Sequence, residues 1–234
     1  MSRNTWIAAG AVYLLVAAAL AGVFLYAPTE KTMGDIQRIF YFHVSSAWVS
    51  FLAFFLACVF SIIFLAKRDL AWDRRAASCA ELGVLFCSLV LITGPLWARP
   101  VWGVWWTWDI RLSTTLVLWL MYAAYLILRS VVVDPQRRAA VAAVVAVIGF
   151  VNVPLSYLSI RWWRTQHPSP VLAGGSASGL DPAMRVAFFI SLAAFTALFL
   201  YLLQRRVQLA AAEGKIEYLY RRLDHLKVQG ARRS

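Results

Sequence analysis

Four tryptophans crowd into one short segment, PVWGVWWTWDIRL, at residues 100–112. These tryptophans, and the aspartate that follows them directly, are Trp102, Trp105, Trp106, Trp108 and Asp109. If the segment is helical, Trp102, Trp105, Trp106 and Asp109 follow the spacing i, i+3, i+4 and i+7, which places three indoles and a carboxylate on one face. Such a face would be a flat apolar shelf. This surface suits a flat, π-rich ligand, because aromatic side chains bury large areas against such a ligand.

Two of the three histidines could bind a metal beside that shelf. His43 comes just before a long apolar run, and His167 lies in the connection between the last two such runs. Arg99 and Arg111 flank the tryptophans and could pair with carboxylates. A flat ligand that carries carboxylates and whose metal accepts axial imidazoles has the description of heme. A lone histidine at a helix end is more often an ordinary interfacial residue, which is the alternative for His43 and for His167 taken singly. We interpret His225, in the basic tail, in this way.

The composition indicates which elements must position these side chains. With 62% hydrophobic and only 15% charged residues, the chain falls outside the range of soluble domains and is expected to be a membrane protein. A bilayer-spanning helix needs about 20 apolar residues. Six runs approach or reach that length, at residues 6–26, 46–66, 77–97, 113–129, 139–158 and 185–203. We therefore predict an all-α, polytopic membrane protein with six transmembrane helices.

The distribution of basic residues predicts the orientation of these helices. Of the 23 lysines and arginines, 16 lie at the N-terminus, in the second and fourth connections and in the C-terminal tail. By the positive-inside rule, both termini are then cytoplasmic and the odd-numbered connections face outward, which in a bacterium is the periplasm. His43, His167 and the tryptophan segment all fall on the outward side.

A membrane-interface belt is the alternative explanation for the tryptophans, because indoles are enriched at both bilayer boundaries. Eight tryptophans lie at or beyond the predicted outer boundary, whereas only Trp6 and Trp72 mark the inner one. A two-sided belt does not account for this asymmetry, which favours a ligand-binding role.

We divide the chain into a six-span membrane domain, residues 1–203, with the outward tryptophan segment at 97–112, and a basic cytoplasmic tail, residues 204–234. In the tail, Ile216, Leu219, Leu223 and Leu226 form one apolar helical stripe. The stripe could lie on anionic lipid or dock a cytoplasmic partner, and the sequence leaves both open. Glu81 lies within a predicted span, where an acid indicates either function or an interhelical hydrogen bond.

Other function classes are disfavoured. Cys58, Cys79 and Cys87 fall inside predicted spans without a C-x-x-C pair, which is typical of small buried residues and not of thiol chemistry. The sequence has no P-loop, so any ATP-driven step would need a partner. A transmembrane b-type cytochrome needs histidines within its spans, and no predicted span contains one.

The motifs resemble a known family. WGVWWTWDIRL resembles the tryptophan-rich WWD signature of heme-handling proteins in cytochrome c maturation. RIFYFHVSSAW precedes this motif in the chain, and NVPLSYLSIRWWRTQH and DPAMR follow it. The four motifs extend across most of the chain, and together they are similar to the CcmC, or heme exporter protein C, family.

The resemblance implies a heme-binding inner-membrane protein that is not an enzyme. It would hold heme b at the periplasmic face and deliver it to the heme chaperone CcmE, beside the subunits CcmA, CcmB and CcmD. His43 and His167 would be the axial ligands. The residues expected to contact heme are Arg99, Trp102, Trp105, Trp106, Trp108, Asp109, Arg111, Trp162 and Trp163. The alternative is a scaffold subunit of a membrane transporter that binds no heme.

Overall fold

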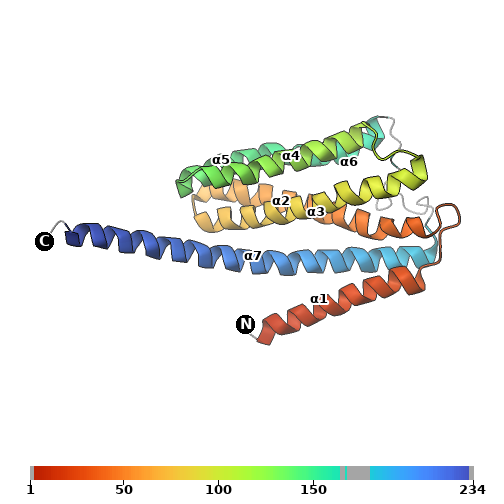
Figure 1. Cartoon of the computed structure of the whole chain (residues 1–234), viewed down its shortest axis with the longest axis horizontal. Helices are drawn as coiled ribbons and strands as arrows, with labels where there is room; N and C mark the ends of the chain where they lie inside the picture. Colours follow the sequence, from red (N-terminus) through yellow and green to blue (C-terminus); the bar gives the residue numbers. More distant parts are fainter. Residues whose placement is uncertain (1–2, 164–166, 168–179, 232–234) are drawn as a thin grey trace.

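The computed structural model describes residues 3–163, 167 and 180–231, and these form a bundle of long helices (Figure 1). Six of the helical segments are long and apolar enough to cross a membrane, which confirms the predicted all-α, six-span fold. The helices, in chain order, are α1 (Arg3–Ala21), extended by a π-helical turn η1 (Gly22–Tyr26), a 3-10 turn η2 (Asp35–Arg38), α2 (Ile39–Lys67), α3 (Leu70–Trp102), α4 (Ile110–Val131), α5 (Pro135–Phe150), α6 (Asn152–Trp162) and α7 (Pro182–Ala231).

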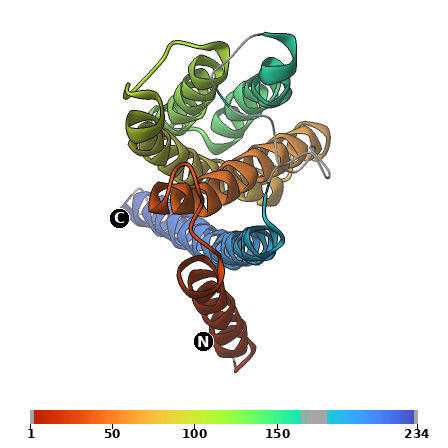
Figure 2. The same ribbon diagram turned by 90° about the vertical axis from the view of Figure 1, so that its right-hand side faces the viewer.

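The helices form a row when the bundle is viewed from its end (Figure 2). α1 lies at one edge and contacts α7, α2 and α3 pack against each other in the middle, and α4, α5 and α6 form the other edge. Both termini lie at the end of the bundle where α2 meets α3 and α4 meets α5 (Figure 1). We call this the basic end, because it carries the majority of the lysines and arginines, and the opposite end the histidine end.

Aromatic packing joins α2, α3 and α4 in the core. The rings of Phe54 and Tyr122 stack with centroids 3.9 Å apart, and the Tyr122 hydroxyl donates to the Ala146 carbonyl at 3.0 Å. Gly83 makes the stack possible, since a Cβ at this position would lie 2.4 Å from the Phe54 ring. Cys58, Cys79 and Cys87 are buried in the bundle, as predicted.

Short polar turns end the spans at the basic end. Asp69 caps α3 by accepting from the Ala71 amide at 2.8 Å, and Asp134 caps α5 by accepting from the Arg137 amide at 2.7 Å. Each carboxylate satisfies an amide that has no partner within its helix. These caps keep the α2–α3 and α4–α5 connections short, so that neighbouring helices run antiparallel.

Three details differ from the predicted spans. α2 begins at Ile39, so His43 lies in its second turn and not before the span. The fifth span is broken at Val151 into α5 and α6, because Pro154 has no N–H for the Phe150 carbonyl. The sixth span continues without interruption through the tail as α7, along which Ile216, Leu219 and Leu223 are exposed, whereas the side chains of Leu226 and His225 lie outside the described residues.

Candidate functional site

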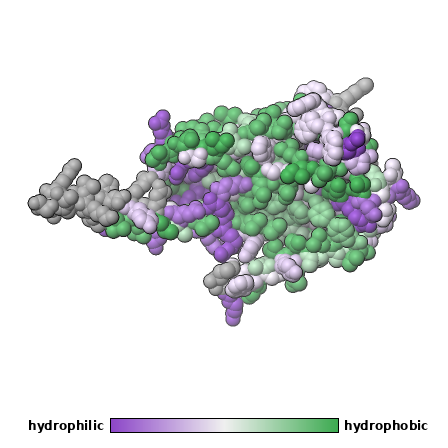
Figure 3. Space-filling model, viewed as in Figure 1, coloured by the Kyte–Doolittle hydropathy of each residue, from purple (hydrophilic) through white to green (hydrophobic). Residues whose placement is uncertain are grey.

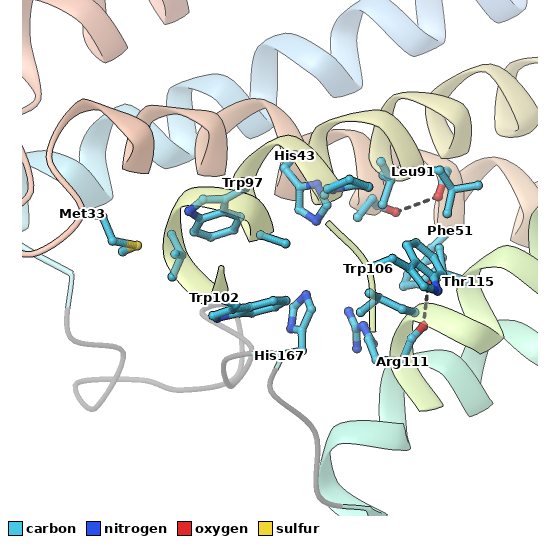
Figure 4. Close-up of a pocket in the computed structure, with 18 residues that line it drawn as sticks. Met33, His43, Phe51, Leu91, Trp97, Trp102, Trp106, Arg111, Thr115 and His167 are labelled. Atoms are coloured by element: carbon cyan, nitrogen blue, oxygen red, sulfur yellow. Dashed lines mark hydrogen bonds between the residues drawn. The ribbon is translucent and has the colours of Figure 1, made fainter. Parts of the chain in front are cut away.

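A pocket at the histidine end contains residues from five parts of the chain, one of which is the connection before η2, with Met33 (Figure 4). α2 contributes His43, the end of α3 contributes Trp97 and Trp102, and the α3–α4 connection with the start of α4 contributes Trp106 and Arg111. His167 enters from the connection between α6 and α7. We call this the histidine pocket.

The two histidines face the same space from segments far apart in the sequence (Figure 4). His43 and His167 lie between two aromatic groups, with Trp97 and Trp102 on one side and Trp106 on the other. Two imidazoles placed in this way could approach one metal from separate chain segments.

Thr93 orients the ring of His43. The Nδ1 atom of His43 lies 2.9 Å from the Thr93 hydroxyl oxygen, and that hydroxyl donates its single proton to the Leu89 carbonyl at 2.6 Å. The threonine oxygen therefore accepts, and Nδ1 of a neutral His43 must be the protonated nitrogen. Nε2 is left with its lone pair available, which is the tautomer that a metal-binding imidazole needs.

The surroundings of His43 limit its movement. Its side chain is buried, and the Trp97 ring lies edge-on to it with centroids 5.9 Å apart. Gly94 lies directly beside the imidazole, where a Cβ would be 3.4 Å from Cε1 of His43 and in contact with it. His43 is thus fixed by α2, by Thr93 and by Trp97.

The tryptophan segment is not one continuous helix, because residues 103–109 are not helical, so the predicted arrangement of three indoles on one helical face is wrong. α3 ends at Trp102, because Gly103 adopts a left-handed conformation with φ 79° and its amide caps the Arg99 carbonyl. α4 begins only at Ile110. Trp102 and Trp106 line the histidine pocket, whereas Trp105 is 57% exposed and Trp108 is 78% exposed.

Asp109 and Arg111 hold the first turn of α4 in place. The Asp109 carboxylate caps α4, accepting from the Leu112 amide at 3.0 Å and from the Thr107 hydroxyl at 3.3 Å. Arg111 lines the pocket and donates to the Ser156 and Tyr157 carbonyls of α6, at 3.1 and 3.2 Å. Arg111 therefore joins α4 to α6 while its guanidinium borders the pocket.

The structure brings together five of the eleven predicted site residues. The residues that line the pocket are His43, His167, Trp102, Trp106 and Arg111. The residues that are not among its described lining are Arg99, Trp105, Trp108, Asp109, Trp162 and Trp163. The sequence analysis did not single out Trp97, Thr93 or Gly94 as site residues. Trp97 could have been found, because it lies in the outward segment five residues before Trp102.

Two buried donors in the pocket have no hydrogen-bond partner in the described part of the chain. They are the indole N–H groups of Trp97 and Trp106. A buried donor without an acceptor destabilises a fold by about 1–3 kcal/mol, so such donors in a pocket indicate a ligand that accepts from them. With the Arg111 guanidinium close by, an anionic oxygen is the acceptor that the pocket favours.

The enclosed part of the pocket is small. Its volume is about 130 Å³. Pockets that bury most of a small organic ligand usually measure about 300–1,000 Å³. A larger flat ligand would therefore be gripped at one edge and would extend beyond the pocket.

The fold and the pocket together define a multi-pass α-helical membrane protein with an aromatic, two-histidine pocket at one end of its bundle. The chain belongs to the heme exporter protein C (CcmC) family, whose model matches residues 1–221. The heme exporter protein C of Bradyrhizobium diazoefficiens is 36% identical over 97% of this chain and 83% of its own length. The heme exporter protein C of Escherichia coli K12 is 33% identical over 77% of this chain and 72% of its own length. A third relative is the putative cytochrome c biosynthesis ccmC-like mitochondrial protein of Marchantia polymorpha. It is 31% identical over 89% of this chain and 90% of its own length.

Proposed function

We propose that this protein binds heme b as cargo in the histidine pocket and delivers it to the heme chaperone CcmE. The observation that carries the proposal is the placement of His43 and His167 in one aromatic pocket, with Thr93 directing the Nε2 lone pair of His43 away from the hydrogen bond. The family, a component of heme export, supplies the identity of the cargo.

Each side chain of the pocket has a role in this proposal. His43 and His167 are the axial ligands of the iron. Trp102 and Trp106 contact the porphyrin face, and the N–H groups of Trp97 and Trp106, with Arg111, are donors for its carboxylates. Trp105, Trp108, Trp162 and Trp163 are exposed at the same end and would contact the part of heme that extends beyond the enclosed volume.

Partial enclosure suits a protein that transfers its ligand. A heme held at one edge leaves the remainder accessible to an acceptor, so the chaperone could bind before the axial bonds are released. This protein would therefore act in transport and transfer, beside CcmA, CcmB and CcmD, and not as an enzyme. ATP-driven steps would belong to a partner.

The proposed orientation places the histidine end at the periplasmic face of a bacterial inner membrane. The basic end is then cytoplasmic, as the positive-inside rule requires. Two cysteine variants test this: Thr32→Cys, at an exposed site before α2, and Val133→Cys, at an exposed site between α4 and α5. A membrane-impermeant thiol reagent added to intact cells should label only the first, since the native cysteines are buried. Labelling of only the second would invert the protein.

The alternative function is a scaffold subunit that binds no heme. An absorption spectrum of the detergent-purified protein, co-expressed with its partners, separates the two. The proposal predicts a Soret band that depends on His43 and His167. A colourless, folded protein would support the scaffold and overturn the proposal.

A further inference from the structure

A second cavity lies at the basic end, between α7 and the ends of α3, α4 and α5. Its volume is about 670 Å³, several times that of the enclosed histidine pocket. Figure 3 shows hydrophilic residues gathered in a hollow at this end, between the main bundle and α7, with hydrophobic surface beside them. We call it the basic cavity.

Cations outnumber carboxylates in the basic cavity. The basic residues that line it are Arg74, Arg129, Arg138, Arg206 and Lys215. The acidic residues that line it are Asp73, Glu81 and Glu213. A group with negative charge would therefore be attracted to it.

Two of the cations are already neutralised by the protein. Arg129 makes a two-bonded ion pair with Asp73, at 2.5 and 2.9 Å. Arg206 of α7 pairs with Glu81 of α3 and also with Glu213 at 3.3 Å. The acid noted within a span thus makes an interhelical ion pair.

The other three cations have no such partner among the described residues. Within the described residues, no carboxylate lies at salt-bridge distance from Arg74, Arg138 or Lys215. The Nε atom of Arg138 is buried and donates to no described acceptor. A buried guanidinium N–H without an acceptor is unfavourable, so an anion that accepts from Arg138 would stabilise this wall of the cavity.

Neighbouring side chains place this cavity at the level of the lipid headgroups. Trp72 lies one residue before Asp73, with Arg75 over its ring at 4.6 Å and Lys67 at 5.6 Å. Tryptophan with basic residues around it is typical of the membrane–water boundary. The α2–α3 and α4–α5 turns lie at the same end, which agrees with this depth.

We propose that the basic cavity binds the phosphate of an anionic phospholipid headgroup. Basic pockets between transmembrane helices at the leaflet surface are suited to such headgroups. Leu70, Ala77 and Ala210 supply apolar wall beside the charges, which a lipid's glycerol and upper chains can contact and an inorganic anion cannot. A phospholipid also reaches a hollow in the side of the bundle by diffusing within the leaflet, whereas an acidic protein segment would have to enter from solvent.

The test uses the full-length protein in a neutral detergent and measures its thermal unfolding. Short-chain phosphatidylglycerol, short-chain phosphatidylcholine and inorganic phosphate are titrated separately, because a ligand that binds the folded state raises the unfolding temperature. The double variant Arg74→Gln/Arg138→Gln removes two unpaired cations. The matched control is Arg137→Gln, which removes an exposed cation next to Arg138 that does not line the cavity.

Phosphatidylglycerol should stabilise the wild type and Arg137→Gln equally, and the double variant should bind it roughly tenfold more weakly. Phosphatidylcholine should have little effect. Equal stabilisation by inorganic phosphate would overturn the lipid assignment in favour of a free anion. An equal response of all three proteins to phosphatidylglycerol would overturn the site. The absence of any response in the wild type would also overturn the proposal, and an acidic protein partner would then be the occupant to test. Heme content should stay normal in the double variant, so this test is independent of the proposed function.

Discussion

The two cavities of this protein lie at opposite ends of the bundle and differ in the polar and charged groups that line them. The histidine pocket is mainly apolar and aromatic, and its polar groups are two imidazoles, one guanidinium, three indole N–H groups and the hydroxyls of Ser50 and Thr115. The basic cavity contains eight ionic side chains, and ion pairs within the protein neutralise part of them. Directional groups suit a ligand of defined geometry, whereas an excess of cations attracts a negative charge with less demand on geometry.

The comparison separates binding from stability. Substitutions of the pocket tryptophans should change heme content with little change in folding, because the indole N–H groups of Trp97 and Trp106 have no hydrogen-bond partner to lose among the described residues. Substitutions in the ion pairs of the basic cavity should change folding first.

Replacing either axial ligand should have the largest effect. His43→Ala or His167→Ala should reduce heme affinity by more than about 100-fold, because each removes a bond to the iron, whereas loss of a supporting residue alone costs about 10–100-fold. The measurement is the Soret absorbance per mole of purified protein. His225→Ala, in the tail helix, is the control and should leave the spectrum unchanged. Normal spectra in both pocket variants would disprove the ligand assignment.

Breaking the buried ion pair should affect stability and not heme. Asp73→Asn leaves Arg129 without its charge partner, and the loss of one member of a buried pair destabilises a protein by about 3–5 kcal/mol. Thermal or denaturant unfolding in detergent measures this. Asp69→Asn is the matched control, since asparagine caps a helix about as well as aspartate. Reduced heme content per folded Asp73→Asn protein would mean that the two ends are coupled.

Removing the hydroxyl that orients His43 should have an intermediate effect. Thr93→Val keeps the shape of the side chain but removes the acceptor for Nδ1–H, so the wrong tautomer becomes accessible and heme affinity should fall about tenfold. Thr93→Ser should restore both the affinity and the position of the Soret band. A purely structural role for Thr93 would lower stability without moving that band.

The smallest expected effect on heme content comes from the tryptophans, and it distinguishes those that line the pocket from those on the exposed surface. Trp102→Ala with Trp106→Ala should lower heme content severalfold, because both indoles line the pocket. Trp105→Ala with Trp108→Ala removes the same area from exposed positions and should lower it less. Heme content of well-inserted protein is the measurement for both pairs. The reverse order would place heme on the outer surface, and no change in either pair would favour a membrane-interface belt.

The sequence was sufficient for features that depend on local composition. Each of the six spans is a run of apolar residues, and a run of this kind forms a helix in a bilayer whatever its neighbours are. The break at Val151 was missed because hydropathy continues through Pro154, although proline is itself a local signal. The helical tryptophan face was wrong because Gly103 ends α3 by its backbone conformation, which spacing alone does not reveal.

What the sequence by itself determined is therefore the six-span fold, the uneven distribution of basic residues and the residue types suited to a flat, metal-containing ligand. Hydropathy, charge and motif spacing are properties of the chain before it packs. Only the tertiary structure decided which side chains meet: His43 with Thr93, fifty positions apart, Glu81 with Arg206 across α3 and α7, and Trp97 in the pocket while Trp105 is exposed. These pairings depend on the rotation of each helix about its axis. That rotation is set by packing against neighbouring helices, so it cannot be predicted from any single segment of the sequence.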